Sequence, residues 1–432
     1  MVNSSANTKP NLKTEAIAGV TTFFTMAYIV IVNPQILSAE GKTGMAFNGV
    51  LTATVLICFA MTLFMGLYAK LPFAVAPGMG INAFFTYNII LAKGVPWPTA
   101  LGVVFWAGVL FLIISATPIR ESIAKAIPAE LRIAAAAGIG VFLTFIGLKN
   151  AGFVVADPVT LVKLGALGKP AILAIVGVAI AAFLMARRSP FAFLAAIAVV
   201  TLAAWSFGLV TRPPQLFSLP DFSSVFLKLD IIGALKLSLL PAIIALLFTD
   251  LFDSISTFIG VAHAGDLLDK DGHPKNLRQG LIVDSFATLG AGLAGSSSGT
   301  AYIESIAGIR MGGRTGMTAI FTALCFLPCL FIAPLAAMVP PFATAAVLIM
   351  VGAAMFTSVG KINLSKIEEG VPAFLTLILI PLTFSITQGI LWGFISHVGL
   401  YLMVGRRRDI HPVMYALALV SIGLLVLERV NF

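Results

Sequence analysis

Charged residues are scarce in this chain. Only 10% of its 432 residues are Asp, Glu, Lys or Arg, while 59% are hydrophobic. No water-soluble fold needs so much apolar surface, so the composition indicates an all-α protein that crosses a membrane many times. The basic residues responsible for the net charge of +9 lie in short loops between apolar runs. No basic face with interleaved aromatic residues is present, so we expect a lipid bilayer and no nucleic acid as partner.

Cysteine and histidine are equally rare, with three and four residues. The cysteines, Cys58, Cys325 and Cys329, lie inside apolar runs, which favours buried packing over disulfides. No spacing of His, Cys and carboxylates resembles a metal site, and no nucleophile–base set is evident. We therefore expect no metal, no cofactor and no enzymatic activity.

Long apolar runs, by contrast, fill the sequence. A membrane-spanning helix needs about 20 apolar residues, and the third and tenth runs are short and interrupted by glycine. The fourteen expected spans are 16–33, 49–69, 78–91, 97–117, 132–148, 170–186, 190–208, 237–262, 279–295, 300–309, 316–337, 342–359, 371–386 and 388–404. A further run, 412–428, either crosses the membrane or lies along its surface.

The distribution of basic residues predicts which side of the membrane each loop faces. With the N-terminus inside, 19 of the 27 Lys and Arg fall on the inner side and 8 on the outer side, Lys42 and Lys149 among the latter. Cytoplasmic loops carry such an excess. We therefore expect fourteen crossings of the inner (plasma) membrane with both ends in the cytoplasm.

The chain also repeats weakly. The stretch IPAELRIAAAAGIG resembles VPPFATAAVLIMVG, so that Pro128 matches Pro340 and Gly140 matches Gly352, both at an offset of 212 residues. Because each half holds seven expected spans, an odd number, the two halves must be inverted relative to each other. Paired interrupted helices in an inverted repeat indicate the central site of a transporter.

The first interrupted helix is LPFAVAPGMGINAFF, residues 71–85. Its two prolines prevent a continuous helix, and Gly80 lets the backbone approach a ligand closely. Asn82 follows; it either caps the half-helix or contacts a solute.

The second interrupted helix, residues 295–316, carries Tyr302 and Glu304 and is expected to resume as a helix near Ser305. Irregular polar backbone at membrane depth persists only where protein buries it or a water-filled cavity meets it. Two facing half-helices with acids between them suit a neutral, flat solute that donates hydrogen bonds, and Tyr302 could stack on it.

Two more acids, Asp250 and Asp253, lie three residues apart in the eighth span and so share a helical face. Such acids are costly in a bilayer unless paired, hydrated or protonated, which marks them as functional candidates; a structural role stays open for each. Asp284, in the ninth span, is expected to pair with an arginine. Hydroxyl residues of the first span, including Thr25 and Tyr28, are typical of helix packing.

Several motifs in order resemble the AzgA-like purine permeases of the nucleobase–cation symporter 2 family, also called nucleobase–ascorbate transporters. They are TTFFTMAYIVIVNPQIL, APGMGINAFF, IGLKNAG, LFDSISTFIGV, TAYIES, GGRTGMTA and VPAFLTLILIPLTFSIT. The resemblance, over residues 14–409, implies two inverted seven-span repeats with short strands in spans three and ten. It implies a core domain of residues 14–120 and 236–338, a gate domain of 121–235 and 339–409, and an apolar tail of 410–432.

The resemblance also implies a function: uptake of purine bases by proton symport, through an elevator-type motion of core against gate. Guanine or hypoxanthine is the expected substrate, with adenine or xanthine as alternatives, and pairing through gate domains would give a homodimer. The residues it implies for substrate binding are Glu304, Asp250, Asp253, Asn82 and Tyr302, to which we add Ile303, Gly80 and Thr25. Asp250 and Glu304 are also the candidates for proton coupling.

Two other classes were weighed. An anion transporter or exchanger of the same inverted-repeat architecture could carry bicarbonate, sulfate or a dicarboxylate. The three acids within the membrane would, however, repel such an anion. An intramembrane enzyme would need a catalytic set that the sequence does not contain.

Overall fold

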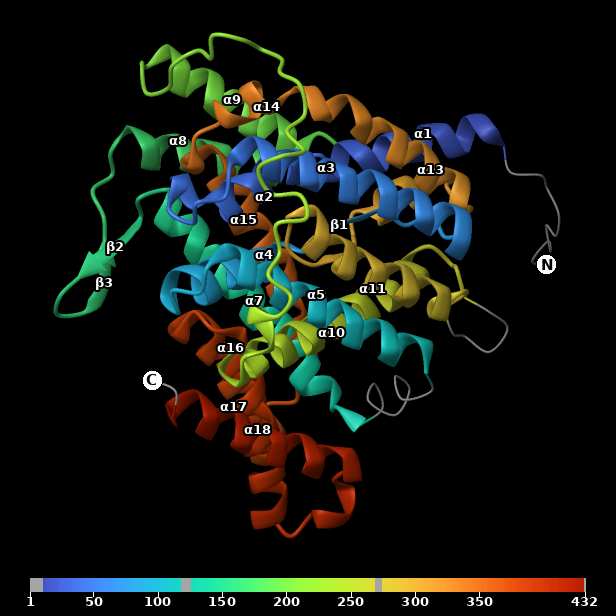
Figure 1. Cartoon of the computed structure of the whole chain (residues 1–432), viewed down its shortest axis with the longest axis vertical. Coiled ribbons are helices and arrows are strands. Elements are labelled where there is room, and N and C mark those ends of the chain that lie inside the picture. Colours follow the sequence, from blue (N-terminus) through green and yellow to red (C-terminus); the bar gives the residue numbers. More distant parts are fainter. Residues whose placement is uncertain (1–10, 118–125, 269–273, 431–432) are drawn as a thin grey trace.

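The computed structural model describes residues 11–117, 126–268 and 274–430. Within these residues, eight helices are long and apolar enough to cross a membrane, and four shorter apolar helices accompany them. Most helices run roughly parallel to one another in a single bundle (Figure 1). The expected boundary between the first core and gate segments, 120/121, lies outside the described residues.

The first half of the chain begins with two shorter helices and a long one, followed by a strand and a broken helix and then by further long helices. Its elements are α1 (Leu12–Met26), α2 (Ile29–Ser38), α3 (Phe47–Phe64), η2 (Met65–Ala69), β1 (Val75–Pro77), α4 (Met79–Ala83), η3 (Phe84–Ala92), α5 (Trp97–Ala116), α7 (Ala129–Asn150), β2 (Val154–Asp157), β3 (Leu161–Leu164), α8 (Lys169–Ala186) and α9 (Ala192–Ser206).

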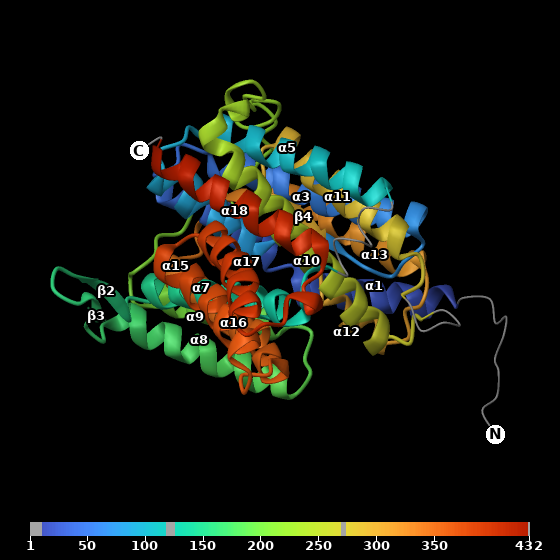
Figure 2. The same cartoon turned by 90° about the horizontal axis from the view of Figure 1, so that it is seen from below.

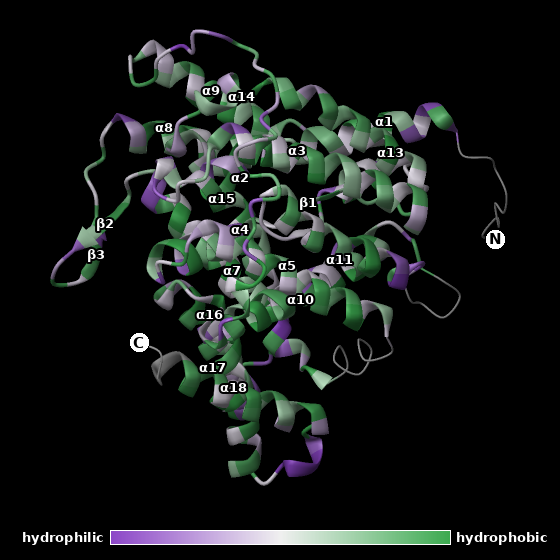
Figure 3. Ribbon diagram, in the orientation of Figure 1, coloured by the Kyte–Doolittle hydropathy of each residue, from purple (hydrophilic) through white to green (hydrophobic). Residues whose placement is uncertain are grey.

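The second half follows a similar order. Its main elements are α10 (Leu240–Ala264), α11 (Leu277–Ala294), β4 (Gly299–Ala301), α12 (Ser305–Arg310), α13 (Gly316–Phe326), α14 (Ala333–Ala337), α15 (Pro341–Phe356), α16 (Ile367–Thr383), α17 (Ile386–Met403) and α18 (Pro412–Val430). Hydrophobic residues cover most of the helices' length, whereas hydrophilic residues gather at the start of α1 and in the β2–β3 loop (Figure 3).

Helices from the two halves pack against each other in pairs. In one group α7 packs against α15 and α16, and α8 and α9 pack against α15. In the other, α1 packs against α13, α5 against α11, and α3 against both α11 and α13. The groups meet where α10 contacts α17 and where α4 contacts α7.

The positions that suggested a repeat occupy equivalent places. Pro128 immediately precedes α7, and Pro340 immediately precedes α15. Gly140 and Gly352 meet where these two helices cross: a Cβ added at Gly140 would stand 2.6 Å from the carbonyl oxygen of Gly352, and one at Gly352 would overlap the carbonyl of Gly140. Glycine is therefore required at both positions for α7 and α15 to approach so closely.

The strands expected before the two half-helices are present and pair with each other. β1 and β4 run antiparallel, with Ala76 opposite Thr300. Open strand edges are not tolerated in hydrocarbon unless side chains satisfy them. On the β1 edge, Thr62 of α3 accepts a hydrogen bond from the Val75 N–H (2.9 Å) and donates one to its carbonyl (3.0 Å).

The β4 edge is satisfied from α11. Asp284 accepts a hydrogen bond from the Ala301 N–H at 3.0 Å, and Thr288 lies 3.2 Å from the Gly299 carbonyl oxygen. The partner of Asp284 is thus the strand backbone and not the arginine expected from the sequence. The pattern of apolar residues could not show this, because the unpaired edge exists only once β1 and β4 have met.

The last helix, α18, runs alongside α10 and packs against α17 as well (Figure 2). It ends on the side of the bundle that carries the β2–β3 hairpin, whereas α1 begins at the opposite side (Figures 1 and 2). The described chain therefore starts and finishes at opposite ends of the bundle. This differs from the expectation of both ends on one side, which counted fourteen crossings and left the run 412–428 aside.

Candidate functional site

Glu304 lies at the bend between β4 and α12, and α12 begins at Ser305 as predicted. Its side chain is half-buried, and its Oε1 accepts a hydrogen bond from the Tyr28 hydroxyl at 2.6 Å. The hydroxyl of Thr25 lies 3.5 Å from the Glu304 carbonyl oxygen. Tyr28 and Thr25 flank the interruption between α1 and α2, so this interruption meets that between β4 and α12.

The two residues before Glu304 face different surroundings. Tyr302 is buried, its N–H donates to the Ala74 carbonyl at 2.9 Å and its hydroxyl to the Pro77 carbonyl at 2.5 Å. Both polar groups of Tyr302 are thus used to hold β1, and its ring is the part left for a solute. The Ile303 side chain is 56% exposed and points away from the buried strand pair.

Asp250, on α10, is buried behind β4. Its Oδ2 accepts hydrogen bonds from Ser298, at 2.7 Å, and from Thr288. Its Oδ1 has no partner among the described residues. A buried carboxylate oxygen without a donor is costly, so Asp250 has an acceptor available for a proton or a ligand.

Asp253 lies one helical turn further along α10 and is half-buried. Its helix, α10, contacts β4 and α12, the two elements on either side of Glu304, so Asp253 and Glu304 lie on neighbouring elements. Two like charges across a helix seam repel each other in a low-dielectric environment. The pair is therefore favoured when one carboxyl is neutral or when a hydrogen-bond donor lies between them.

Asn82 does not cap its half-helix: the residue at the start of α4 is Gly78, and no side chain caps that end. Asn82 is fully buried, and its Oδ1 accepts a hydrogen bond from Ser297. Its Nδ2 has no partner among the described residues. The capping alternative is therefore wrong, and an N–H donor is left over beside the strand pair.

Gly80 lies against another helix, whereas the sequence predicted that it lies close to a ligand. A Cβ at this position would overlap the side chain of Ile139 on α7. The missing side chain thus lets α4 pack against α7, at one of the places where the helix groups meet. Thr25, in turn, makes its shorter hydrogen bond within α1, to the Thr22 carbonyl at 2.7 Å.

The run Ser296–Ser298 was not among the predicted site residues, yet it joins the site together. Ser296 accepts from the Asn33 amide of α2 at 3.0 Å, Ser297 donates to Asn82, and Ser298 donates to Asp250. Three consecutive serines before a broken helix, in apolar sequence, were a usable signal. Tyr28 was assigned to helix packing because nothing in the sequence places it beside Glu304.

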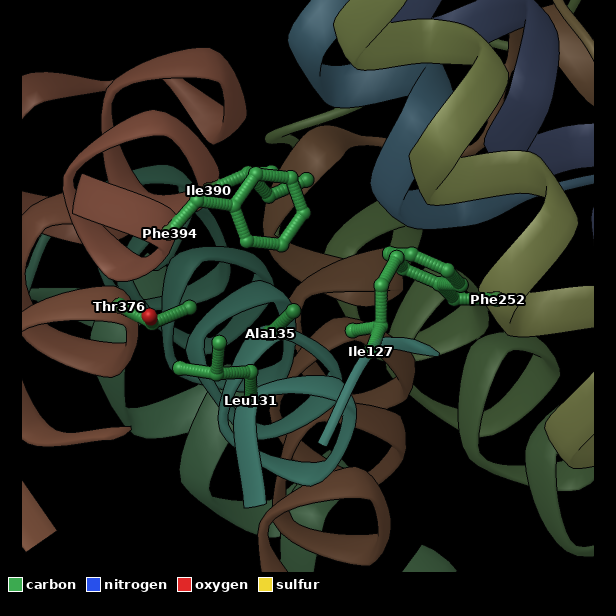
Figure 4. A pocket seen from close by; sticks show the side chains of 7 residues that line it. All are labelled: Ile127, Leu131, Ala135, Phe252, Thr376, Ile390 and Phe394. Carbon is green, nitrogen blue, oxygen red and sulfur yellow. The ribbon is translucent and has the colours of Figure 1, made fainter. Parts of the chain in front are cut away.

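An apolar seam adjoins these residues. Side chains from α10, α7, α16 and α17 converge on a cavity of about 10 Å³, with Phe252, the neighbour of Asp253, on one side (Figure 4). Such a volume holds about one water molecule. The lining residues are Ile127, Leu131, Ala135, Phe252, Thr376, Ile390 and Phe394. The two helix groups are therefore in close apolar contact here.

In the part of the chain that the structure describes, no three His, Cys, Asp or Glu residues are placed to hold a metal ion. The polar groups instead surround a strand pair between two broken helices, inside a bundle of apolar helices. Unwound backbone of this kind at membrane depth is the construction used by solute transporters. Fold and site together define a multi-pass membrane transport protein.

Comparison with known proteins gives the family. A family model named Xan_ur_permease, described as "Permease family", matches residues 13–391, and the chain belongs to this family. It is 42% identical to the adenine permease AdeP of Escherichia coli (strain K12), covering 95% of this chain and 92% of that protein. It is 40% identical to the guanine/hypoxanthine permease PbuO of Bacillus subtilis (strain 168), covering 95% of this chain and 96% of that protein.

A solved structure shares the fold at lower identity. The transmembrane domain of the cyanobacterial bicarbonate transporter BicA matches with a TM-score of 0.66 and 19% identity, covering 90% of this chain and 98% of that chain. At this identity the likeness shows the fold alone.

Proposed function

We propose that this protein imports purine nucleobases by proton symport. The observation that carries the proposal is the hydrogen bond between Glu304 and Tyr28, which joins two interrupted helices, in a chain 40–42% identical to permeases named for adenine and for guanine/hypoxanthine. Guanine or hypoxanthine is the proposed substrate, with adenine or xanthine as alternatives.

Recognition would use the acids as hydrogen-bond acceptors. Glu304 would accept N–H bonds from the edge of the base, with Asp253 beside it and the Tyr302 ring against its face. Asp250 and Asn82, each with a side-chain atom that has no partner among the described residues, would complete the contacts directly or through Ser297 and Ser298. Each such bond contributes roughly 0.5–3 kcal/mol.

The proton would bind Asp250 or Glu304. A neutral carboxyl crosses a low-dielectric barrier at a far smaller free-energy cost than a carboxylate does. Binding a proton together with a neutral base would therefore allow the loaded site to move, whereas the empty, charged site would be held back.

The motion we propose is a slide of the core domain, residues 14–120 and 236–338, against the gate domain, residues 121–235 and 339–409. Both half-helices belong to the core, so the whole site would travel as one unit. The contacts that would have to change include those of α10 with α17 and α7, of α4 with α7 and of α1 with α9. The protein would lie in the plasma membrane with its N-terminus in the cytoplasm, and two gate domains would pair in a homodimer.

An anion transporter of the same architecture is the second candidate, because the fold is shared with a bicarbonate transporter. The buried and half-buried acids Asp250, Asp253 and Glu304 oppose it, since none of the three forms an ion pair with a basic residue within the described part of the chain. Competition settles the choice: unlabelled purines should reduce hypoxanthine uptake, and bicarbonate or sulfate should not.

The central test is Glu304→Gln, assayed by uptake of labelled hypoxanthine in cells that lack their own purine permeases. The amide replaces an acceptor oxygen with a donor, so we expect uptake to fall at least about tenfold, as for a lost hydrogen bond to a charged group, with unchanged expression. Glu130→Gln, the same substitution in the first turn of α7, is the matched control. Wild-type uptake by Glu304→Gln would refute the assignment.

Proton coupling is tested separately. A protonophore should abolish concentrative uptake by the wild type, and uptake should decline as the external pH rises. Uptake that responds to neither treatment would remove the proton from the mechanism and leave the substrate assignment standing.

A further inference from the structure

A second pocket lies between the helix groups, at the end of the bundle that the charge distribution places outside. We call it the outer pocket; its volume is about 250 Å³, and its polar lining includes Gln35, Glu40, Tyr87, Lys149, Asn150 and Thr344. Pockets for drug-sized ligands measure about 300–1,000 Å³, so this one suits a small planar heterocycle. Its walls come from α2 and η3 on one side and from α7 and α15 on the other.

One helical segment contributes residues to both the outer pocket and the central site. Tyr87 follows Asn82 by five residues on the continuous segment of α4 and η3, a distance of about 7 Å along the helix axis. A solute in the outer pocket would thus lie one short step from the strand pair.

Two side chains give the pocket its chemistry. The Lys149 ammonium stands over the Tyr87 ring, 5.4 Å from its centroid, so the ring face is open to the pocket and already holds a cation. Lys149 is exposed at the last turn of α7, and its flexible stem lets the ammonium move aside. An aromatic face beside a mobile ammonium group, which can donate three hydrogen bonds, is suited to a planar ring with acceptors on its edge.

The other polar groups are mostly engaged. Gln35 accepts from the Thr344 hydroxyl at 2.7 Å and donates to the Val339 carbonyl at 2.6 Å, so its amide is fixed. Glu40 pairs with Lys42, which also lines the pocket, at 3.6 Å, whereas Lys149 is the cation that stands over the Tyr87 ring. The Glu40 carboxylate at the rim and the apolar remainder of the lining disfavour a small inorganic anion.

We propose that the outer pocket is a capture site for 6-oxopurines, with the base stacked on Tyr87 and its edge accepting a hydrogen bond from Lys149. Guanine and hypoxanthine present two adjacent acceptors, N7 and O6, to which lysine donates readily, whereas adenine replaces O6 by an amino donor. The site therefore favours 6-oxopurines over adenine before the base reaches Glu304. This proposal rests on the proposed function.

The first test is Lys149→Gln, with uptake of hypoxanthine and of adenine measured over a range of concentrations. We expect the KM for hypoxanthine to rise about tenfold, as for one lost hydrogen bond from a charged donor, with kcat unchanged and the KM for adenine within about twofold. Tyr87→Leu should raise both KM values. Lys163→Gln, a substitution of another lysine on the same side, is the matched control. An unchanged KM for hypoxanthine, or an equal rise for adenine, would overturn the proposal.

The second test measures binding without transport. Asn150→Cys, in a chain whose three cysteines are replaced by alanine and which carries Glu304→Gln, is labelled with a membrane-impermeant maleimide. Hypoxanthine should slow the labelling, while adenine should do so less and sulfate or bicarbonate not at all. Protection by the anions alone would overturn the proposal. If the wild type takes up no purine but hypoxanthine still protects, the proposed function fails and the capture site stands.

Discussion

Glu304 and Tyr28 are 276 positions apart in the chain, yet a hydrogen bond of 2.6 Å joins them. Tyr28 is almost completely buried and lies at the interruption between α1 and α2. Its hydroxyl therefore fixes the orientation of the one acid that ends a strand and begins a half-helix. This bond is the most direct link between the first span and the proposed substrate site.

Replacing Tyr28 by phenylalanine should reduce hypoxanthine uptake by roughly tenfold or more, because hydrogen bonds to charged groups contribute about 1.5–3 kcal/mol. Uptake kinetics normalised to the amount of protein in the membrane provide the measurement. Tyr68→Phe removes a hydroxyl from a tyrosine that is 45% exposed and should leave uptake unchanged. Equal activity of the two variants would show that the bond has no role in transport.

The sequence predicted the acids of the site better than their partners. Glu304, Asp250 and Asp253 could be found because an acid in an apolar run is costly wherever it lies. The hydroxyls that bond them could not, since Thr288 and Tyr28 resemble the ordinary packing residues of membrane helices. Thr288 acquires its role only where α10, α11 and the segment before β4 meet, and Tyr28 only where the interruption between α1 and α2 meets Glu304.

At the scale of elements, the crossing of α4 and α7 requires Gly80. A methyl group there would overlap the Ile139 side chain, whose branching at Cβ leaves it little freedom to move. The same crossing is one of the contacts that would change if core and gate slide. A larger side chain at position 80 should therefore slow the proposed slide of core against gate.

Gly80→Ala should lower the uptake rate several-fold, and adding Ile139→Ala should restore it, because the second change removes the atoms that the new methyl group meets. The rate is compared in all three variants by the same uptake assay. Gly260→Ala is the control, since a Cβ there would meet nothing within 4 Å. Failure of the double variant to recover would mean that Gly80 is needed for another reason, such as contact with the base.

The β2–β3 hairpin, beyond the end of α7, offers a pH-dependent contact outside the membrane. The N–H groups of Thr160 and Val159, together with Lys163, lower the pKa of Asp157 from 3.8 to about 2. A lowered pKa in the folded state adds stability above the ordinary pKa, and this contribution is lost as the pH falls through the folded value.

Asp157→Asn should therefore speed hydrogen exchange of the Val159 and Thr160 amides a few-fold at neutral pH. The ratio of variant to wild-type rates should approach one as the pH falls from about 4 to about 2, because protonated Asp157 loses the same interactions. Exchange of these amides is followed at matched pH in both proteins. A ratio of one at neutral pH would contradict the prediction; Asp221→Asn, in a separate loop, should leave these amides unaffected.

For the whole molecule, α18 decides where the chain ends. It lies beside α10 over part of the bundle and finishes on the side of the β2–β3 hairpin (Figure 2). An epitope tag added after Phe432 should therefore bind antibody in intact cells, whereas one before Met1 should require permeabilised cells. A C-terminal tag that is reached only after permeabilisation would place α18 along the membrane surface.

The helical bundle and its two interrupted helices were predictable from the apolar runs. The fourteen spans, the inversion of the two halves and the inner position of the N-terminus stay predictions. The course of α18 was left open because 412–428 is of marginal length, and length alone cannot distinguish a helix that crosses lipid from one that packs on a neighbour. The packing of α18 against α10 and α17 shows where this helix lies, which hydropathy alone does not.

The strand pair at the centre has a consequence for how the protein is made. Tyr302 and Pro77, which are joined beside the pair, lie 225 residues apart, and a ribosome adds about 5–20 residues each second. The first strand therefore waits on the order of ten seconds or more for its partner to emerge. Thr62, only 13 residues from Val75, is already available to hold one edge of the waiting segment, so the nascent chain satisfies that edge before β4 is synthesised.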